Sequence, residues 1–321
     1  MTARAVLVCD AGPRFGSGHV MRQLTLGREL KLLGYEVELS CAELPIALEE
    51  RAASLGVAVR KRNQSQNSPA LIQALIEASA DILVFDGYEF LPETIEKAHN
   101  SGTLTVVIDD NGEFSEVPCD VILNQNLHAE ISMYASGPSG RSMLIGLEWA
   151  LIREEVAQQD VPEWERRQGL ILSVGGADHR GLGVSVANIL EQADVGPFVR
   201  AGGFYGEVSM SPAEMASVMA HSMLGVLACG TTTWEALCLG LPTVGLVVAD
   251  NQIHVAESLS KAGLSQYLDC REELDAGRLI ELIRSALEDP IRLDRVSRDS
   301  RAMVDGLGGR RVAQALDSLI G

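Results

Sequence analysis

The chain has 321 residues, of which 46% are apolar and 22% charged, and this globular composition excludes a disordered protein. Its formal net charge of −18 at pH 7 argues against nucleic acid or an anionic membrane surface as a partner. No apolar run approaches the roughly 20 residues of a membrane span, and the six cysteines form no CxxC pair. We therefore expect a cytoplasmic protein without a zinc site or a disulfide framework.

The length predicts two domains, and strands alternate with helices in each half of the chain. In the first half, strands are predicted over 5–9, 37–41, 57–60, 82–85, 104–108 and 121–123, and helices over 19–33, 46–55, 70–78 and 91–99. This order is typical of a doubly wound parallel sheet, which binds ligands at the carboxyl ends of its strands.

A charged segment over 147–167 predicts a short connecting helix and a linker before a second alternating series. Strands are then predicted over 170–174, 197–200, 224–228 and 243–248, and helices over 183–192, 212–220, 232–239, 254–262, 273–287 and 310–320. We predict an α/β protein with two facing Rossmann-like domains and a cleft between them. The expected boundaries are an N-terminal domain over 1–150, a linker over 151–168, a C-terminal domain over 169–303 and a final helix over 304–321.

The first motif that suggests chemistry is the glycine-rich segment from Asp10 to Arg22, between the first strand and the first helix. Glycines such as Gly16 and Gly18 let the backbone approach a ligand, and a helix N-terminus offers free N–H groups. The spacing is neither that of a P-loop nor GxGxxG. His19 at the helix start can act as a general base or orient a substrate, and a structural or capping histidine is the alternative.

A second motif, CGTTTWE, joins a strand to a helix in the second half. The hydroxyls of Thr231, Thr232 and Thr233, beside Gly230, can cap the helix or donate to phosphate oxygens. Glu235 lies in the first turn of this helix, and its carboxylate can accept hydrogen bonds from both hydroxyls of a ribose. A plain capped helix is the alternative.

Polar residues also follow other predicted strands, on the edge where such sheets bind ligands. Asn251 and Gln252 suit a nucleotide or a sugar, or a turn. Gly175 and Gly176 predict a close approach to a ligand or a tight turn. Asp86, Tyr88, Asp109 and Asp110 follow strands of the first half, and we interpret Asp109 and Asp110 as loop or capping residues.

Together and in this order, the motifs resemble those of one family. GSGHVMRQLTLGREL is similar to the GTGHVMRCLTLA signature of the UDP-sugar hydrolases of pseudaminic acid biosynthesis, the PseG type. DGY, VIDD, ILNQN, IGLEWALIREE, SVGGAD, GTTTWEALCLGLP, ADNQ and DGLGGRRVA follow in the family's order. The family itself resembles MurG-like GT-B glycosyltransferases, which bind a nucleotide-sugar between two Rossmann domains.

The resemblance implies hydrolysis of a UDP-linked sugar at the anomeric carbon with inversion, in nonulosonic (pseudaminic-type) acid biosynthesis, without a metal or a cofactor. The family's substrate is UDP-2,4-diacetamido-2,4,6-trideoxy-altropyranose. The implied catalytic residues are His19 and Tyr88. Implied UDP contacts are Gly175, Gly176, Gly230, Thr231, Thr232, Thr233, Glu235, Asn251 and Gln252, and implied sugar contacts are Gly16, Gly18, Arg22, Asp86 and Asp250.

The chain departs from the family pattern in three places. Gly87 stands where the family often has histidine, Cys229 replaces a glycine, and the segment over 188–220 is shorter than usual. The first departure bears on sugar contacts and the last on the uracil pocket. Two other functions stay open: a glycosyltransferase that passes the sugar to an acceptor, and a nucleotide-sugar-binding protein without catalysis.

Overall fold

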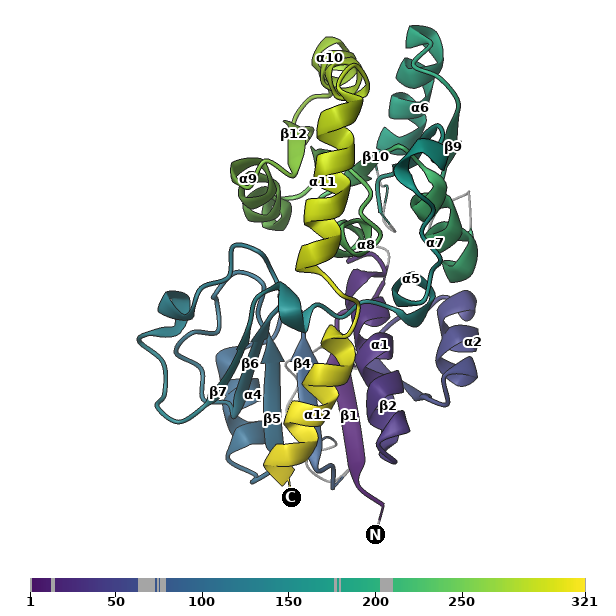
Figure 1. Ribbon diagram of the computed structural model, residues 1–321. Helices are drawn as coiled ribbons and strands as arrows, with labels where there is room; N and C mark the ends of the chain where they lie inside the picture. Colours follow the sequence, from purple (N-terminus) through teal and green to yellow (C-terminus); the bar gives the residue numbers. More distant parts are fainter. Residues whose placement is uncertain are drawn as a thin grey trace. The chain divides into compact units, whose positions relative to one another are not determined.

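The computed structural model describes residues 2–12, 15–62, 73, 75, 79–175, 178, 180–202 and 210–320. The chain divides into two compact units, each considered by itself. Unit 1 comprises Met1–Phe15, His19–Leu151 and Leu307–Gly321, and unit 2 comprises Gly16–Gly18 and Ile152–Gly306. The last helix, α12 (Gly308–Ile320), therefore belongs to unit 1 although it follows unit 2 in the sequence (Figure 1).

Unit 1 is built on a seven-stranded parallel sheet of order β3-β2-β1-β4-β5-β6-β7. Its strands are β1 (Arg4–Cys9), β2 (Glu36–Cys41), β3 (Ala58–Lys61), β4 (Ile82–Asp86), β5 (Leu104–Ile108), β6 (Val121–Asn124) and β7 (Ser142–Ile145). Its other described elements are α1 (Gly18–Leu32), α2 (Ile46–Ser54), α4 (Pro92–His99), α12, η1 (Ile131–Tyr134) and η2 (Leu147–Trp149).

Side chains alternate between the two faces of the unit 1 sheet along each strand, and apolar side chains on both faces are buried. Leu7 of β1 packs against α1, where the missing side chain of Gly27 leaves room for it. Val6 and Val8 belong to a second buried cluster, together with Ile95 of α4. The near-continuous apolar strands seen in the sequence are therefore strands buried on both sides.

Unit 2 has a five-stranded parallel sheet of order β12-β11-β10-β8-β9. Its strands are β8 (Leu170–Ser173), β9 (Phe198–Arg200), β10 (Leu224–Ala228), β11 (Thr243–Val247) and β12 (Ser265–Asp269). Its other elements are α5 (Glu154–Ala157), η3 (Trp164–Arg166), α6 (Leu182–Ala193), α7 (Pro212–His221), α8 (Thr232–Cys238), η4 (Asp250–Gln252), α9 (Ile253–Lys261), α10 (Ala276–Leu287) and α11 (Pro290–Met303).

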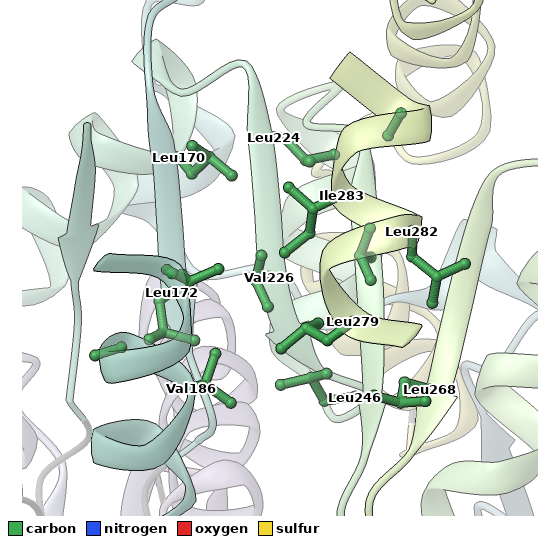
Figure 2. Close-up of a cluster of buried hydrophobic side chains, with 14 of the residues drawn as sticks. Leu170, Leu172, Val186, Leu224, Val226, Leu246, Leu268, Leu279, Leu282 and Ile283 are labelled. Carbon is green, nitrogen blue, oxygen red and sulfur yellow. The ribbon is translucent and has the colours of Figure 1, made fainter. Parts of the chain in front are cut away.

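The core of unit 2 lies between one face of this sheet and two helices. Leu172 and Val226 of the sheet meet Val186 of α6 and Leu279 and Ile283 of α10 in one buried cluster (Figure 2). This packing fixes the carboxyl ends of β8, β10 and β11, from which the loops of the candidate nucleotide site leave.

The sequence predicts most of these elements within one to three residues at each end. Among the described strands and α-helices, three are absent from the prediction: β7, β12 and α11. The predicted helix over 70–78 lies mostly outside the described residues. Among the residues that the structure describes, no helix has the length and apolar character needed to cross a bilayer.

Candidate functional site

Unit 1 has a switch point between β1 and β4, where the chain reverses the direction in which it adds strands to the sheet. Open α/β sheets bind ligands in the crevice outside such a point. Asp10 directly follows β1, Asp86 ends β4, and Tyr88 lies in the turn after β4. Helix α1 brings His19 and Arg22 to the same edge. Four of the predicted site residues thus come together in unit 1.

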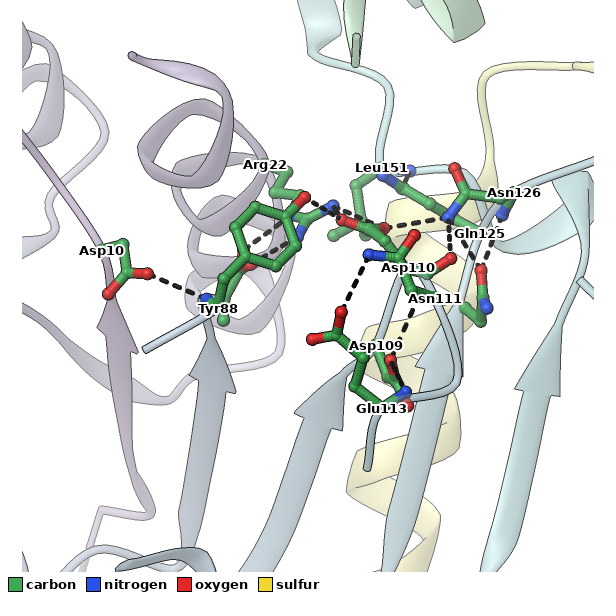
Figure 3. A network of polar contacts seen from close by, with 12 residues as sticks. Asp10, Arg22, Tyr88, Asp109, Asp110, Asn111, Glu113, Gln125, Asn126 and Leu151 are labelled. Atoms are coloured by element: carbon green, nitrogen blue, oxygen red, sulfur yellow. Dashed lines mark hydrogen bonds and ion pairs between the residues drawn. The ribbon is translucent and has the colours of Figure 1, made fainter. Parts of the chain in front are cut away.

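Arg22 is the centre of the polar network at this edge (Figure 3). Its Nε donates to Asp86 Oδ2 at 2.7 Å and its Nη2 to Asp86 Oδ1 at 2.5 Å. Its Nη1 donates to both oxygens of Asp110 at 3.0 Å. Burial alone would lower the pKa of Arg22, but the carboxylates of Asp110 and Asp86 raise it well above its usual value. Arg22 is therefore a permanent cation that holds two acidic residues in place.

Asp110 corrects the interpretation of the two adjacent acidic residues as loop or capping groups. Asp109 does fit it, since its carboxylate accepts backbone N–H groups from Asn111 and Phe114 in its own loop. Asp110 instead accepts from Arg22, from the Tyr88 hydroxyl at 3.0 Å and from Asn126 Nδ2 at 2.9 Å. Burial alone would raise the pKa of Asp110, but Arg22 and the hydrogen bond from Asn126 lower it, so the residue stays an anion.

His19 lies in the first turn of α1 and is only 6% exposed. Its ring meets Tyr88 edge to face, with centroids 5.0 Å apart and planes at 62°. Within the described part of the chain, its Nδ1 atom has no hydrogen-bond partner. Burial lowers the pKa of His19, against the opposing effect of Asp86. The imidazole is therefore neutral at pH 7 and able to accept a proton.

Asp10 is fully buried beside this group. Its Oδ2 accepts the backbone N–H of Tyr88 at 2.9 Å. Burial, with a smaller contribution from the neighbouring Asp86, raises the pKa of Asp10 from 3.8 to about 7 against the lowering effect of the Tyr88 N–H. Asp10 is therefore a carboxyl group that changes charge near neutral pH.

The corresponding switch point of unit 2 lies between β8 and β10. Gly175 follows β8, Gly230 and Thr231 follow β10, and Asp250 to Gln252 follow β11. Because β11, β10 and β8 are adjacent parallel strands, these three loops leave the same edge of the sheet. The sheet order thus gathers most of the predicted nucleotide contacts of unit 2.

The loop after β8 leads into α6, and the structure describes Gly175, Asp178 and the residues from 180 onward in it. Gly175 has φ of +89°, a backbone conformation that favours glycine. Asp178 then caps α6, because its Oδ1 accepts the N–H of Leu182 at 2.7 Å and its Oδ2 that of Gly183 at 2.8 Å. Gly176 lies outside the described residues. The positive φ accounts for glycine at position 175, and UDP binding by this loop stays a prediction.

Thr231 occupies the N-cap position of α8, but its side chain makes no capping hydrogen bond. The capping role that the sequence suggested for this hydroxyl is therefore wrong. Thr233 is buried, whereas Thr231 and Thr232 are half-buried. Of the three threonines, these two are the better placed to donate to a ligand.

Glu235 has a partner that the sequence analysis missed. Arg153 Nη2 donates to Glu235 Oε2 at 2.9 Å, and Arg153 Nε lies 2.8 Å from Oε1. Both side chains are largely buried, with exposed fractions of 9% and 13%. The pair fixes the orientation of the carboxylate while leaving lone pairs for other donors. Because the two residues are 82 positions apart, local sequence gave no signal for this contact.

The loop after β11 divides into a fixed and an exposed part. Gln252 Oε1 accepts the backbone N–H of Val248 at 3.0 Å, and its Nε2 lies near Gly230. Asn251 and Asp250 are exposed, and Asp250 pairs with Arg271 at 2.5 Å. Gly230 and Gln252, both predicted UDP contacts, are thus neighbours in the structure.

Comparison with solved structures shows the class of fold. MurG of Acinetobacter baumannii matches with a TM-score of 0.64 and 13% identity over 98% of this chain and 99% of that one. The spinosyn forosaminyltransferase SpnP matches with 0.67 and 13% identity over 98% of both chains. A putative UDP-N-acetylglucosamine 2-epimerase from Listeria monocytogenes matches with 0.62 and 13% identity, over 99% and 97%. The chain therefore has the predicted two-domain, Rossmann-like GT-B fold.

Two curated proteins are similar in sequence, and no protein-family model matches. One is the UDP-2,4-diacetamido-2,4,6-trideoxy-beta-L-altropyranose hydrolase of Campylobacter jejuni, 25% identical over 187 residues. That alignment spans 58% of this chain and 65% of the hydrolase. The other is the spore coat polysaccharide biosynthesis protein SpsG of Bacillus subtilis, 21% identical over 98% of this chain and 97% of that protein. The predicted resemblance to the hydrolase is confirmed.

Proposed function

We propose that this protein hydrolyses a UDP-linked sugar at the anomeric carbon and releases UDP and the free sugar with inversion. The observation that carries the proposal is the neutral, buried His19 at the switch point of unit 1, in a chain similar to a UDP-sugar hydrolase. The proposed sugar is a diacetamido-trideoxy hexose, as in the name of that relative, and the proposed pathway is nonulosonic acid biosynthesis.

Nucleotide binding is assigned to unit 2. The hydroxyl of Thr231, which makes no capping hydrogen bond, and the carboxylate of Glu235, oriented by Arg153, lie on one short segment after β10. Hydroxyl groups can donate to pyrophosphate oxygens, and a carboxylate can accept from the ribose hydroxyls. The loop after β11 adds the Gln252 amide near Gly230. These features support the proposed UDP contacts.

The chemical step is assigned to His19. A neutral imidazole takes a proton from water as the water oxygen bonds to the anomeric carbon. The bond between that carbon and the UDP oxygen breaks, and the electron pair leaves with UDP. A single displacement from the opposite face inverts the anomeric centre. Tyr88, with 37% of its surface exposed, is the proposed second residue at the sugar.

A glycosyltransferase is the second candidate, favoured by the fold that this chain shares with the forosaminyltransferase SpnP over 98% of both chains. In that reaction an acceptor hydroxyl replaces water, and the same base removes its proton. The two functions differ only in the acceptor, so a single assay separates them.

The test measures UDP release from a panel of UDP-linked amino sugars without an acceptor, with the free sugar followed by NMR. We expect His19→Ala to lower kcat by about a hundredfold or more, the contribution of a general base. His221→Ala, on an exposed histidine of α7, is the control and should behave like wild type. The NMR spectrum also shows which anomer of the free sugar forms first, and this anomer distinguishes inversion from retention. If the UDP-sugar binds but UDP is released only after an acceptor is added, the transferase replaces the hydrolase as the proposed function.

A further inference from the structure

Asp10 and Gly87 meet closely beside the carboxyl ends of β1 and β4. A Cβ atom on Gly87 would lie 2.4 Å from both Cγ and Oδ2 of Asp10, closer than real Cβ atoms come to a neighbour. The backbone of Gly87 does not itself demand glycine, since its φ is not among the positive values of the chain. The Asp10 carboxylate therefore fills the space that a side chain at position 87 would need.

From this position Asp10 holds one end of Tyr88. Its Oδ2 accepts the Tyr88 N–H at 2.9 Å, while the Tyr88 hydroxyl at the other end donates to Asp110 at 3.0 Å. Between these two anchors the Tyr88 ring lies edge to face with His19 at 5.0 Å. Figure 3 shows Asp10, Tyr88 and Asp110 in this order.

We propose that Asp10 is a positioning residue that fixes Tyr88 against the His19 imidazole, and that glycine at position 87 makes this contact possible. The inference rests on the proposed function, which assigns the chemical step to His19 and Tyr88. Asp10 itself touches no reacting atom. Without its carboxylate, the turn after β4 loses the acceptor of the Tyr88 N–H, and Tyr88 is no longer held at its backbone end.

The first test is a double-mutant cycle on UDP release. Asp10→Ala should lower kcat about tenfold to a hundredfold, the usual effect of a misplaced group, and change KM little. Asp10→Asn should keep most of the activity, because its carboxamide oxygen still accepts the Tyr88 N–H. In a Tyr88→Ala background, Asp10→Ala should have no further effect, because the residue it positions is gone.

Gly87→Ala provides an independent variant that leaves Asp10 itself unchanged. Its new Cβ would displace the carboxylate, so kcat should fall as in Asp10→Ala. Gly277→Ala is the matched control, since a Cβ there meets only Asp275 Oδ1 at an ordinary 3.4 Å. Gly277 lies in α10 of unit 2, and its substitution should leave UDP release unchanged.

A readout that does not need activity is the NMR spectrum of ¹⁵N-labelled histidine. The Tyr88 ring shifts the His19 signals, which the His19→Ala spectrum identifies. Asp10→Ala and Gly87→Ala should move these signals toward their positions in Tyr88→Ala. The inference would be overturned by two results together. In the Asp10→Ala/Tyr88→Ala double variant, the loss of kcat would equal the product of the two single losses, and in Asp10→Ala the His19 signals would not move. If no variant affects UDP release, the proposed function fails, and the His19 signals alone then decide whether Asp10 positions Tyr88.

Discussion

The Arg22 guanidinium and the Asp86 carboxylate form a bidentate ion pair that is almost completely buried, with exposed fractions of 4% and 0%. A buried pair is costly to break, because the remaining partner keeps its charge without its counter-charge. Arg22 also binds Asp110, so the pair connects α1, β4 and the loop after β5 in unit 1.

We expect Asp86→Asn to destabilise the protein by about 3 kcal/mol, the usual effect of removing one partner of a buried ion pair. Chemical denaturation followed by circular dichroism measures the change. Asp294→Asn is the control, since Asp294 forms an exposed pair with Arg298 on α11, where the expected effect is below about 0.5 kcal/mol. Equal effects of the two substitutions would contradict the role assigned to the Arg22–Asp86 pair.

Asp10 should make stability depend on pH. Its pKa is raised to about 7 in the folded protein, mainly by burial and further by Asp86 and Glu89, from 3.8. Between these values the folded state binds the proton more tightly than the unfolded state, so stability falls as pH rises from about 4 to 7. Asp10→Asn removes this dependence. The melting temperature of the variant should exceed that of wild type at pH 8, and the difference should shrink toward pH 4.

The contact between Arg153 and Glu235 should affect nucleotide binding. Removing a charged hydrogen-bond acceptor from a binding site costs about 1.5–3 kcal/mol, so Glu235→Ala should weaken UDP binding at least about tenfold. Arg153→Ala should weaken it less, because the carboxylate remains but loses its orientation. Glu257→Ala, on a residue of α9 whose side chain is 41% exposed, is the control. Calorimetric titration with UDP measures all three, and unchanged affinity in Glu235→Ala would refute the ribose contact.

The proposed base should determine the acid limit of the reaction, the pH below which kcat/KM falls. Burial lowers the pKa of His19 from 6.5, so kcat/KM should fall only below that pH, where the imidazole becomes protonated. The profile is best measured in Asp10→Asn, which removes another group that titrates near neutral pH. An acid limit above pH 6.5 in this variant would assign the limiting protonation to another residue.

The missed strands show what the sequence could not reveal. β7 and β12 are edge strands of their sheets, and β12 has only two buried residues among five. The predicted β3 and β9 are edge strands too, so edge position alone does not explain the difference; in β12, Ser265, Gln266 and Asp269 leave no apolar run to recognise. The missed helix α11 is polar over most of its surface, although Asp289 as N-cap and Pro290 at the first turn are start signals that could have found it.

The site was predictable where its residues belong to local motifs. His19, Arg22, Asp86 and Tyr88 lie in motifs that the family resemblance singles out, and the structure places them together at one edge of the unit 1 sheet, while their roles stay predictions. Asp110 and Arg153 were not identified as site residues, since their partners lie 88 and 82 positions away. Asp109 and Asp110 are adjacent and chemically identical. Only tertiary contacts show that one holds its own loop and the other holds Arg22.

The polar edge of unit 1 has an excess of acidic groups. It gathers the side chains of four aspartates and two arginines: Asp10, Asp86, Asp109, Asp110, Arg22 and Arg62. Because Asp10 gains its charge only as the pH rises through about 7, the excess of negative charge at this edge grows with pH, and it disfavours a diphosphate and favours positive charge. In the proposed reaction, the sugar acquires oxocarbenium character as the bond to UDP breaks. The same excess of carboxylates would thus favour binding of the sugar, rather than the diphosphate, by unit 1. It would also stabilise the positive charge on the sugar in the transition state.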